Sequence, residues 1–299
     1  MCPNCHGELR EINDELFCKK CNNLFKKNKY GYFEFIKNRN LYDIVSTTDE
    51  YAAVQDTCGN RIYEGFLKSY FRQESFKSIL DVGCGLGRGI SQLIKEGYRA
   101  YGIDLPQLSV FWRQAQNDPG HFFCSDAGRI PFPSDFFDVV FSLGVIEHIG
   151  TEVGHCTLSD NYRELRQQYA NEILRVTKPN GRILISCPNK HFPLDIQHGP
   201  TDSQSPKNKF RSYVFKKTGI NFHPVWGKYH LLSYSEVKKL FCKNGGARYF
   251  EPIPLKGYFE FKRIRLGLLK SFAEFYIHNM PKAWLASFMN PYVLVQIKK

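Results

Sequence analysis

The feature that most constrains this chain is the run ILDVGCGLGRG at residues 79–89, where an apolar stretch leads into a glycine-rich turn. A helical pattern follows, and Asp104 closes the next apolar run, AYGIDLP. Strand, glycine turn, helix and a second strand ending in an acid form the first half of a nucleotide-binding βαβ unit. Glycines at 83, 85 and 87 let the backbone turn sharply and let a ligand approach its amides. Asp104 falls where a carboxylate accepts hydrogen bonds from ribose hydroxyls.

The glycine spacing indicates which nucleotide the turn suits. A dinucleotide turn, G-x-G-x-x-G, that began at Gly83 would require glycine at 88, but the chain has Arg88 there. The observed D-x-G-x-G-x-G, residues 81–87, resembles the first motif of class I S-adenosylmethionine-dependent methyltransferases, in particular a methyltransferase type 11-like core. The motif alone leaves open a plain glycine-rich turn without a ligand.

The resemblance implies a set of cofactor contacts along the following strands. In the family, an acid after the third strand hydrogen-bonds the adenine amine, and Asp126 in Ser125-Asp126-Ala127 is its counterpart, although a turn or cap role is the alternative. The stretch FPSDFFDVVFS, residues 132–142, and LGVIEH, residues 143–148, resemble the fourth strand and the motif after it. The implied cofactor residues are Asp81, Gly83, Cys84, Gly85, Gly87, Asp104, Leu105, Asp126, Ala127, Ser142 and Leu143.

The fold follows from alternating strand and helix patterns joined by short turns, which predict a doubly wound, Rossmann-like α/β sheet. The two last strand patterns, 247–253 and 292–297, have a long connection between them. They match the antiparallel hairpin that closes the class I methyltransferase sheet, so the resemblance implies seven strands. The resemblance is supported by specific motifs over residues 50–190 and by the hydrophobic pattern alone over residues 230–299.

Two cysteine pairs precede this core. Cys2-Pro3-Asn4-Cys5 and Cys18-Lys19-Lys20-Cys21 are CxxC knuckles joined by a linker long enough for a hairpin. Four thiolates from two tight turns suit a tetrahedral zinc ion, so Cys2, Cys5, Cys18 and Cys21 are the expected ligands of a structural Zn²⁺. A thioredoxin-type redox role is the lesser alternative, because neither pair precedes a long helix. A zinc ribbon ahead of such a core resembles both a bacterial ribosomal-RNA guanine methyltransferase family and methyltransferases of small-molecule and glycan pathways.

We expect a zinc ribbon at 1–45 and a methyltransferase domain at 46–299, with substrate-side insertions at 187–230 and 257–290. The formal net charge of +12 is unevenly distributed along the chain: +2 for residues 1–45, −4 for residues 46–205 and +14 for residues 206–299. A basic C-terminal third attracts RNA, an anionic membrane surface or an acidic substrate, or serves solubility alone. The chain shows neither an 18-residue apolar run nor a signal-peptide pattern, and its cysteines are not spaced as a secreted scaffold. These features predict a cytoplasmic protein, free or at a membrane surface.

Methyl transfer to an alcohol, phenol or amine needs positioning, exclusion of water and, for some acceptors, a base. His148 follows the fourth strand and is the first candidate, with a cleft-lining role as the alternative. His191 lies in the loop after the fifth strand, where His198, Asp195, His223 and His230 are further candidates. Metal binding by these residues is weakly indicated, because no H-x-x-x-H spacing occurs.

Residues 261–289 combine an apolar stripe (Phe261, Ile264, Leu268, Phe272, Phe275) with flanking basic residues. Such a helix lies on an anionic membrane, covers an apolar substrate or simply packs in the core. The sequence favours O-methylation of a small-molecule or lipid-linked metabolite. The alternative is an RNA base methyltransferase, and a different class is a nucleic-acid-binding protein with a non-catalytic core.

Overall fold

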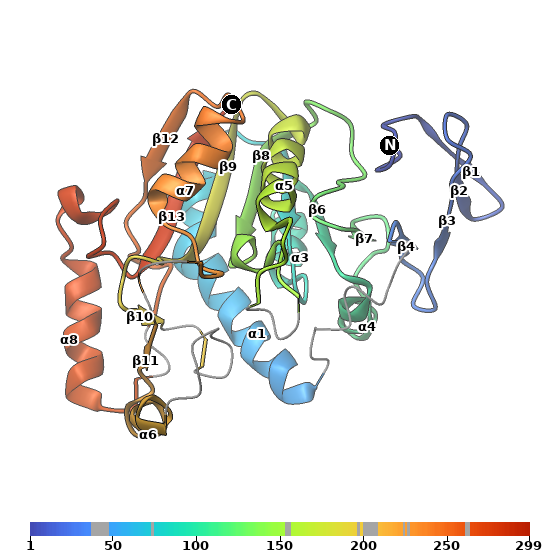
Figure 1. The fold of residues 1–299 in the computed structure, drawn as a ribbon. Coiled ribbons are helices and arrows are strands. Elements are labelled where there is room, and N and C mark those ends of the chain that lie inside the picture. The colour runs from blue at the N-terminus through green and yellow to red at the C-terminus, as the bar shows by residue number, and fades with distance from the viewer. Residues whose placement is uncertain are drawn as a thin grey trace. The chain divides into compact units, whose positions relative to one another are not determined.

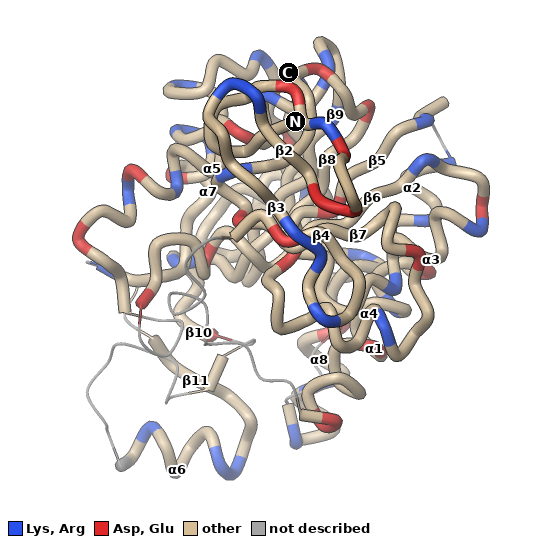
Figure 2. The backbone as a smooth tube through the Cα atoms, turned by 90° about the vertical axis from the view of Figure 1, so that its right-hand side faces the viewer, with Lys and Arg blue, Asp and Glu red and all other residues tan. Residues whose placement is uncertain are grey.

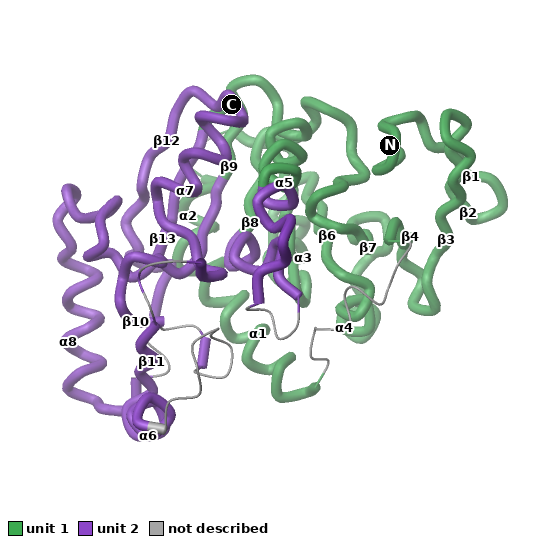
Figure 3. Tube along the Cα trace, viewed as in Figure 1, with its two compact units in different colours: residues 1–142, 167–183, 298–299 green, residues 143–166, 184–297 purple. Residues whose placement is uncertain are grey.

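The computed structural model describes residues 1–36, 48–72, 75–152, 157–195, 198–199, 209–223, 225, 228–260 and 264–299. The chain divides into two compact units (Figure 3). Unit 1 comprises residues 1–142, 167–183 and 298–299, and unit 2 comprises residues 143–166 and 184–297. The division crosses β8 (Phe137–Leu143) after Ser142 and β9 (Thr177–Pro188) after Ile183.

Unit 1 is built on a mostly parallel sheet (Figure 1). Its central strand β5 (Ser78–Val82) is buried along its whole length, and it pairs in parallel with β6 and with β8. Strands buried on both faces are rich in apolar residues, and Ile79, Leu80 and Val82 supply them in β5. The other elements of this core are β6 (Arg99–Asp104), β7 (Phe122–Cys124), α1 (Asp49–Ile62), α2 (Lys68–Arg72), α3 (Arg88–Lys95), α4 (Ser109–Gln114) and α5 (Tyr162–Val176), the last of which begins in unit 2.

The N-terminal segment continues the same sheet. Its strands are β1 (Leu9–Ile12), β2 (Glu15–Cys18), β3 (Leu24–Lys27) and β4 (Phe33–Glu34), each antiparallel to the one before. The last of them, β4, pairs in parallel with β7 through Glu34 and Cys124, and the Phe35 N–H donates to the Cys124 carbonyl at 2.8 Å. Phe25 and Phe35 are buried with Cys2 and Cys18 in a small apolar cluster.

Unit 2 contains the carboxyl end of β9, followed across the sheet by β13 (Tyr292–Lys298) and β12 (Tyr249–Pro252). A second, two-stranded sheet joins β10 (Leu194–Asp195) to β11 (Asn221–Phe222) in antiparallel register. The helices of this unit are α6 (Lys209–Thr218), α7 (Tyr234–Lys238) and α8 (Gly267–His278). Ser233 and Glu236 form a capping box at the start of α7, which satisfies its first backbone N–H groups.

The prediction of an α/β sheet with a late strand pair holds, but the number of seven strands is wrong. Among the described residues, unit 1 places eight strands side by side, in the order β1-β2-β3-β4-β7-β6-β5-β8, and residues 177–183 of β9 lie next to β8. The physical reason is that the cysteine-containing segment adds its strands to the edge at β7 instead of folding apart from the sheet. The boundary expected at residue 45 stays a prediction, and the compact units have other bounds.

Candidate functional site

The glycine turn follows β5 at the carboxyl end of the parallel strands, where open α/β sheets bind ligands. Its backbone is left-handed, with φ of 85° at Gly83, 53° at Gly85 and 75° at Gly87. A Cβ at Gly87 would collide with the ring of Phe122 on β7, whereas one at Gly85 would enter open space. The turn is therefore packed on one side and leaves room at Gly85.

Asp104 at the end of β6 is fixed against this turn. Its carboxylate accepts hydrogen bonds from the Gly85 N–H at 2.6 Å and from its neighbour, the Leu105 N–H, at 2.7 Å. Burial raises the pKa of Asp104 to about 6, although both backbone N–H donors act in the opposite direction. On the other side of the turn, the Trp112 Nε1–H donates to the Gly85 carbonyl at 2.7 Å. The glycine turn and Asp104, which the sequence predicts to be parts of one unit, are therefore in direct contact.

The other predicted residues of unit 1 lie on the same strand ends. Asp81 is buried, and desolvation, with the nearby charge of Asp104, raises its pKa well above the ordinary range. Ser142 is buried, and its hydroxyl donates to the Val82 carbonyl at 2.7 Å. Cys84 is also buried, and its side chain lies where a Cβ at Gly102 would fall.

Asp126 follows β7 in the turn that also carries Ala127. The Ser125 N–H donates to the Asp104 carbonyl at 3.0 Å, which ties this turn to the end of β6. The Asp126 carboxylate accepts a hydrogen bond from the Gly128 N–H at 2.7 Å, as an Asx turn does. Unit 1 thus holds every predicted cofactor residue except Leu143, which belongs to unit 2.

Tyr51 on α1 is a residue that sequence reasoning missed. Burial raises its pKa to about 12, and the charge of Asp104 adds to the shift, so α1 brings this phenol near the carboxylate at the end of β6. Thr48 caps the helix through a hydrogen bond from the Tyr51 N–H. The sequence gives no sign of this contact, because residue types alone do not indicate which aromatic ring of a helix turns inward.

These residues fit an S-adenosyl nucleoside. Asp104 is a carboxylate at the position that ribose hydroxyls require, and the space beyond Gly85 is one that only glycine leaves open. Gly85 also lies beside an acid, not beside an array of cations that a diphosphate would need. When bound, the nucleoside would supply a methyl group on a sulfonium sulfur.

The four predicted zinc ligands converge at the N-terminus. The Sγ atoms of Cys2, Cys5, Cys18 and Cys21 lie within 4.8 Å of one another. Cys2 and Cys21 are 3.6 Å apart, and Cys5 and Cys18 are 3.4 Å apart. Four thiolates on one tetrahedral zinc ion are separated by about 3.8 Å, because each Zn–S bond is about 2.3 Å. The cluster can therefore hold one such ion.

The candidate bases lie in unit 2. His148 ends the short 3₁₀ turn Ile146–His148, is half-buried, and its ring centroid is 5.5 Å from that of His198. His191 is exposed, and its backbone N–H donates to the Asn189 side chain at 3.1 Å. The structure therefore brings His148, and not His191, into a group with other histidines.

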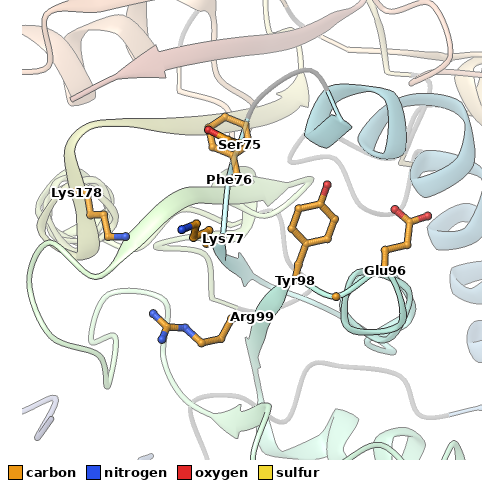
Figure 4. Close-up of a pocket in the computed structure, with 8 residues that line it drawn as sticks. Ser75, Phe76, Lys77, Glu96, Tyr98, Arg99 and Lys178 are labelled. Carbon is orange, nitrogen blue, oxygen red and sulfur yellow. The ribbon is translucent and has the colours of Figure 1, made fainter.

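A pocket of about 640 Å³ opens elsewhere on unit 1 (Figure 4). Its lining comes from the amino ends of β5 and β6 and includes Lys77, Tyr98, Arg99 and Lys178. The glycine turn and Asp104 lie at the opposite ends of these strands. Ligands of open α/β sheets bind at carboxyl ends, so this pocket is not the candidate site.

Comparisons with known proteins agree with this geometry. Residues 80–185 match a methyltransferase domain family model. A probable chloroplastic tocopherol O-methyltransferase of Oryza sativa subsp. japonica is 32% identical over 116 residues, which are 36% of this chain and 28% of that protein. A tRNA U34 carboxymethyltransferase of Shewanella loihica is 37% identical over 86 residues, 26% of each chain. This chain therefore spans little more than a quarter of the length of either relative.

The architecture has a counterpart among solved structures. Phosphoethanolamine N-methyltransferase 2 of Haemonchus contortus, solved with S-adenosyl-L-methionine, has a TM-score of 0.51 and 19% identity, and the match covers 88% of this chain and 60% of that chain. At this identity the likeness concerns the fold alone.

Proposed function

We propose that the chain is an S-adenosylmethionine-dependent methyltransferase. The observation that carries the proposal is the Asp104 carboxylate held against the Gly85 N–H at the carboxyl end of the parallel strands. The match of residues 80–185 to a methyltransferase domain supports it. Asp104 would accept the ribose hydroxyls, Asp126 with Ala127 would face the adenine, and Asp81, Ser142 and Leu143 would lie toward the methionine part. Gly83, Cys84, Gly85, Gly87 and Leu105 would form the wall of the site.

The proposed acceptor is a hydroxyl of a small or lipid-linked metabolite. The rice relative is a probable tocopherol O-methyltransferase, and unit 2 carries a large exposed apolar surface. On α8, Leu268, Phe272 and Phe275 are 93%, 66% and 64% exposed. These side chains, spaced by four and three residues, share one helix face, which is how an interfacial helix meets a lipid surface. The expectation that this stripe packs in the core is wrong at these three positions; Phe261 lies outside the described residues.

The neighbouring helix α6 has the same character. Phe210 and Tyr213 are exposed, and Figure 2 shows Lys and Arg residues along α6. Arg265, just before α8, donates from its backbone and side chain to the carbonyls of Thr218 and Lys216 at 3.0 and 2.6 Å. Basic and apolar side chains together fit an anionic membrane surface. No helix in the described part of the chain is long and apolar enough to span a bilayer.

A base for the hydroxyl proton would be His148, with His191 as the second candidate. His148 is half-buried among other side chains of unit 2, where its ring can take a fixed orientation. The exposed ring of His191 would have to be ordered by the acceptor itself. Replacing each histidine by alanine distinguishes them: the base variant lowers kcat and leaves the affinity for S-adenosylhomocysteine unchanged.

The experiment that tests the function is methyl transfer from radiolabelled S-adenosylmethionine by the full chain. The acceptors are a phenol with an apolar tail in detergent micelles and, in a second arm, total tRNA. Transfer of the radiolabelled methyl group to the extracted acceptor, together with its loss in the Asp104→Ala variant, supports the proposal. Absence of S-adenosylhomocysteine binding, or unchanged transfer in Asp104→Ala, would contradict it.

RNA is the second candidate acceptor, and two observations favour it. One relative is a tRNA U34 carboxymethyltransferase, and the C-terminal third carries a formal charge of +14. Binding to RNA through this charge would weaken steeply with salt, because condensed counterions are released from the phosphates. Label in the tRNA arm, with salt-dependent retention of tRNA, would select this alternative.

We further propose that the N-terminal cysteines hold a structural zinc ion. Support comes from the convergence of the four thiols and from the small apolar cluster around them, which offers little burial by itself. Four protein ligands close the coordination sphere, so this ion would stabilise the first strands and take no part in chemistry. The strands it stabilises continue to β4 and β7, next to the turn that carries Asp126.

A further inference from the structure

A second group of candidate metal ligands lies inside unit 2. We call Asp195, His198 and His230 the histidine cluster; each residue offers a ligand atom, and these atoms lie within 4.8 Å of one another. All three side chains are buried, with exposures of 1%, 9% and 0%. Asp195 ends β10, and His230 precedes α7 by a few residues. The sequence distance between them explains why ligand spacing did not reveal the cluster.

His230 is the observation that points to a ligand. Its ring is fully buried, yet neither Nδ1 nor Nε2 has a hydrogen-bond partner among the residues that the structure describes. A buried polar group without a partner is destabilising, because it loses the hydrogen bonds that it makes to water in the unfolded chain. A neutral imidazole has the lone pair that a metal ion requires.

The spacing within the cluster suits one ion. The ring centroids of His198 and His230 are 5.0 Å apart, and the rings are nearly perpendicular, at 78°. Two imidazoles on one tetrahedral ion have centroids about 5 Å apart, because each metal–nitrogen bond is about 2.0 Å. The Asp195 carboxylate lies 3.1 Å from His198 Nδ1, a separation that two ligand atoms on the same ion also have.

The surrounding side chains hold the backbone of both histidines in place. The buried Asn221 donates from Nδ2 to the His198 carbonyl at 2.9 Å, and its Oδ1 accepts two hydrogen bonds from Arg211. Arg166, itself buried, donates to the His230 carbonyl at 2.6 Å. Such contacts orient ligands and keep a site formed before the ion arrives.

A further buried carboxyl group lies beside the cluster. Glu147 is fully buried, and neither of its carboxylate oxygens has a hydrogen-bond partner among the described residues. Its ligand atom lies within 4.8 Å of those offered by His148 and His198. Arg166, a buried cation near Glu147, directs its side-chain donors to backbone carbonyls, including that of Glu147 at 3.5 Å. A divalent ion bound to the cluster would add positive charge beside these buried carboxyl groups.

We propose that Asp195, His198 and His230 bind a divalent transition-metal ion of the zinc type, distinct from the ion of the N-terminal cysteines. Two imidazoles and one carboxylate select such a metal over Mg²⁺ or Ca²⁺, which prefer oxygen ligands. Three protein ligands leave positions open to water or to an acceptor oxygen. The inference does not rest on the proposed methyl transfer, since its ligands lie in unit 2 and the nucleoside contacts in unit 1, apart from Leu143.

The test is Co²⁺ binding by the metal-stripped full chain, followed by visible absorption. Cobalt on cysteine thiolates gives sulfur-to-metal charge-transfer bands, whereas cobalt on nitrogen and oxygen ligands gives only d–d bands. We expect a d–d component that titrates separately and that Zn²⁺ displaces. His230→Ala and Asp195→Asn should each weaken this binding at least about tenfold and leave the charge-transfer bands and S-adenosylhomocysteine affinity unchanged. His278→Ala, an exposed histidine of α8, is the matched control.

A wild-type chain that binds no Co²⁺ outside the cysteines would overturn the proposal. Unchanged d–d binding in both His230→Ala and Asp195→Asn would do so as well. Because a variant in this buried cluster can lose its fold, ¹⁵N NMR of the histidine rings in the wild-type chain gives a second readout. Zn²⁺ should shift the ring nitrogens of two buried histidines, and no shift beyond those of exposed histidines would count against the site.

Discussion

The Gly85 N–H donates a hydrogen bond to the Asp104 carboxylate at 2.6 Å, and this bond joins the glycine turn after β5 to the end of β6. The bond leaves the remaining lone pairs of this carboxylate for a ligand and fixes its orientation before one binds. Pre-organisation of this kind lowers the entropy that binding would otherwise cost.

Replacing Asp104 by asparagine should weaken the binding of S-adenosylhomocysteine by about 2 kcal/mol, or about 30-fold, because a charged acceptor for ribose hydroxyls is lost. Isothermal titration calorimetry measures the effect. Asp118→Asn is the matched control, since Asp118 is an exposed turn residue that accepts a hydrogen bond from the Gly120 N–H. Equal affinities in the two variants would remove Asp104 from the site.

The affinity for S-adenosylhomocysteine should depend on pH through Asp104. Its pKa in the folded, ligand-free chain is raised to about 6, so the carboxyl is protonated below that pH and ionised above it. The ionised form accepts ribose hydroxyls better, and affinity should therefore rise as pH increases through about 6. For folding the sign is opposite: the stabilisation from the raised pKa is complete below about 4 and is lost as pH rises through about 6. A pH series of titrations with the wild type and Asp104→Asn checks this, and the variant should show a flatter profile.

Gly87→Ala should lower the free energy of unfolding by about 2 kcal/mol or more, because the residue has a φ of 75° and its new Cβ would meet the Phe122 ring. Gly89→Ala is the control. It lies in the first turn of α3 with nothing near its added Cβ, and alanine favours a helix over glycine by up to about 1 kcal/mol. Urea unfolding curves should thus move in opposite directions for the two variants.

Cys5→Ser should lower zinc affinity at the N-terminus more than about 100-fold, because one of four closely spaced thiols is removed. A colorimetric chelator competition measures the affinity, and thermal unfolding should show loss of the first strands. Cys242→Ser, a half-buried cysteine in the turn after α7, should retain zinc. Zinc retained by Cys5→Ser would show that the four thiols do not bind the metal together.

Phe272→Ser with Phe275→Ser should reduce partitioning to vesicles of phosphatidylglycerol and phosphatidylcholine at least about tenfold, since each buried phenyl ring contributes about 2 kcal/mol. Flotation of the full chain with the vesicles gives the bound fraction. Ile12→Ser with Leu24→Ser removes two exposed apolar side chains from unit 1 and should leave partitioning unchanged. If all three proteins float alike, α8 is not a membrane contact.

Sequence reasoning worked best where a local pattern specifies backbone geometry. The glycine turn, the strand before it and the acid at 104 were predicted together, because positive φ angles favour glycine and a buried strand requires mostly apolar residues. The convergence of the four cysteines was also predicted from the sequence, since each tight turn brings two cysteines of a CxxC pair close together. The late pair β12 and β13 was found from pattern alone.

Prediction from the sequence was least successful where residues from distant segments of the chain meet. Tyr51 was passed over, because helical spacing of aromatics does not show which ring reaches Asp104. The eight side-by-side strands of unit 1 were also missed, because the pairing of β4 with β7 joins residues 34 and 124 through backbone atoms that no residue type encodes.

The sequence by itself thus determined the parallel α/β core, the glycine turn with its acid and the four converging thiols, since each depends on short-range backbone geometry. The tertiary structure decided that the cysteine segment extends the sheet and that Phe272 and Phe275 face solvent. It also decided that His198 and His230, far apart in the chain, share one buried cluster with Asp195. The physical reason is that packing, unlike backbone conformation, depends on which distant surfaces fit each other.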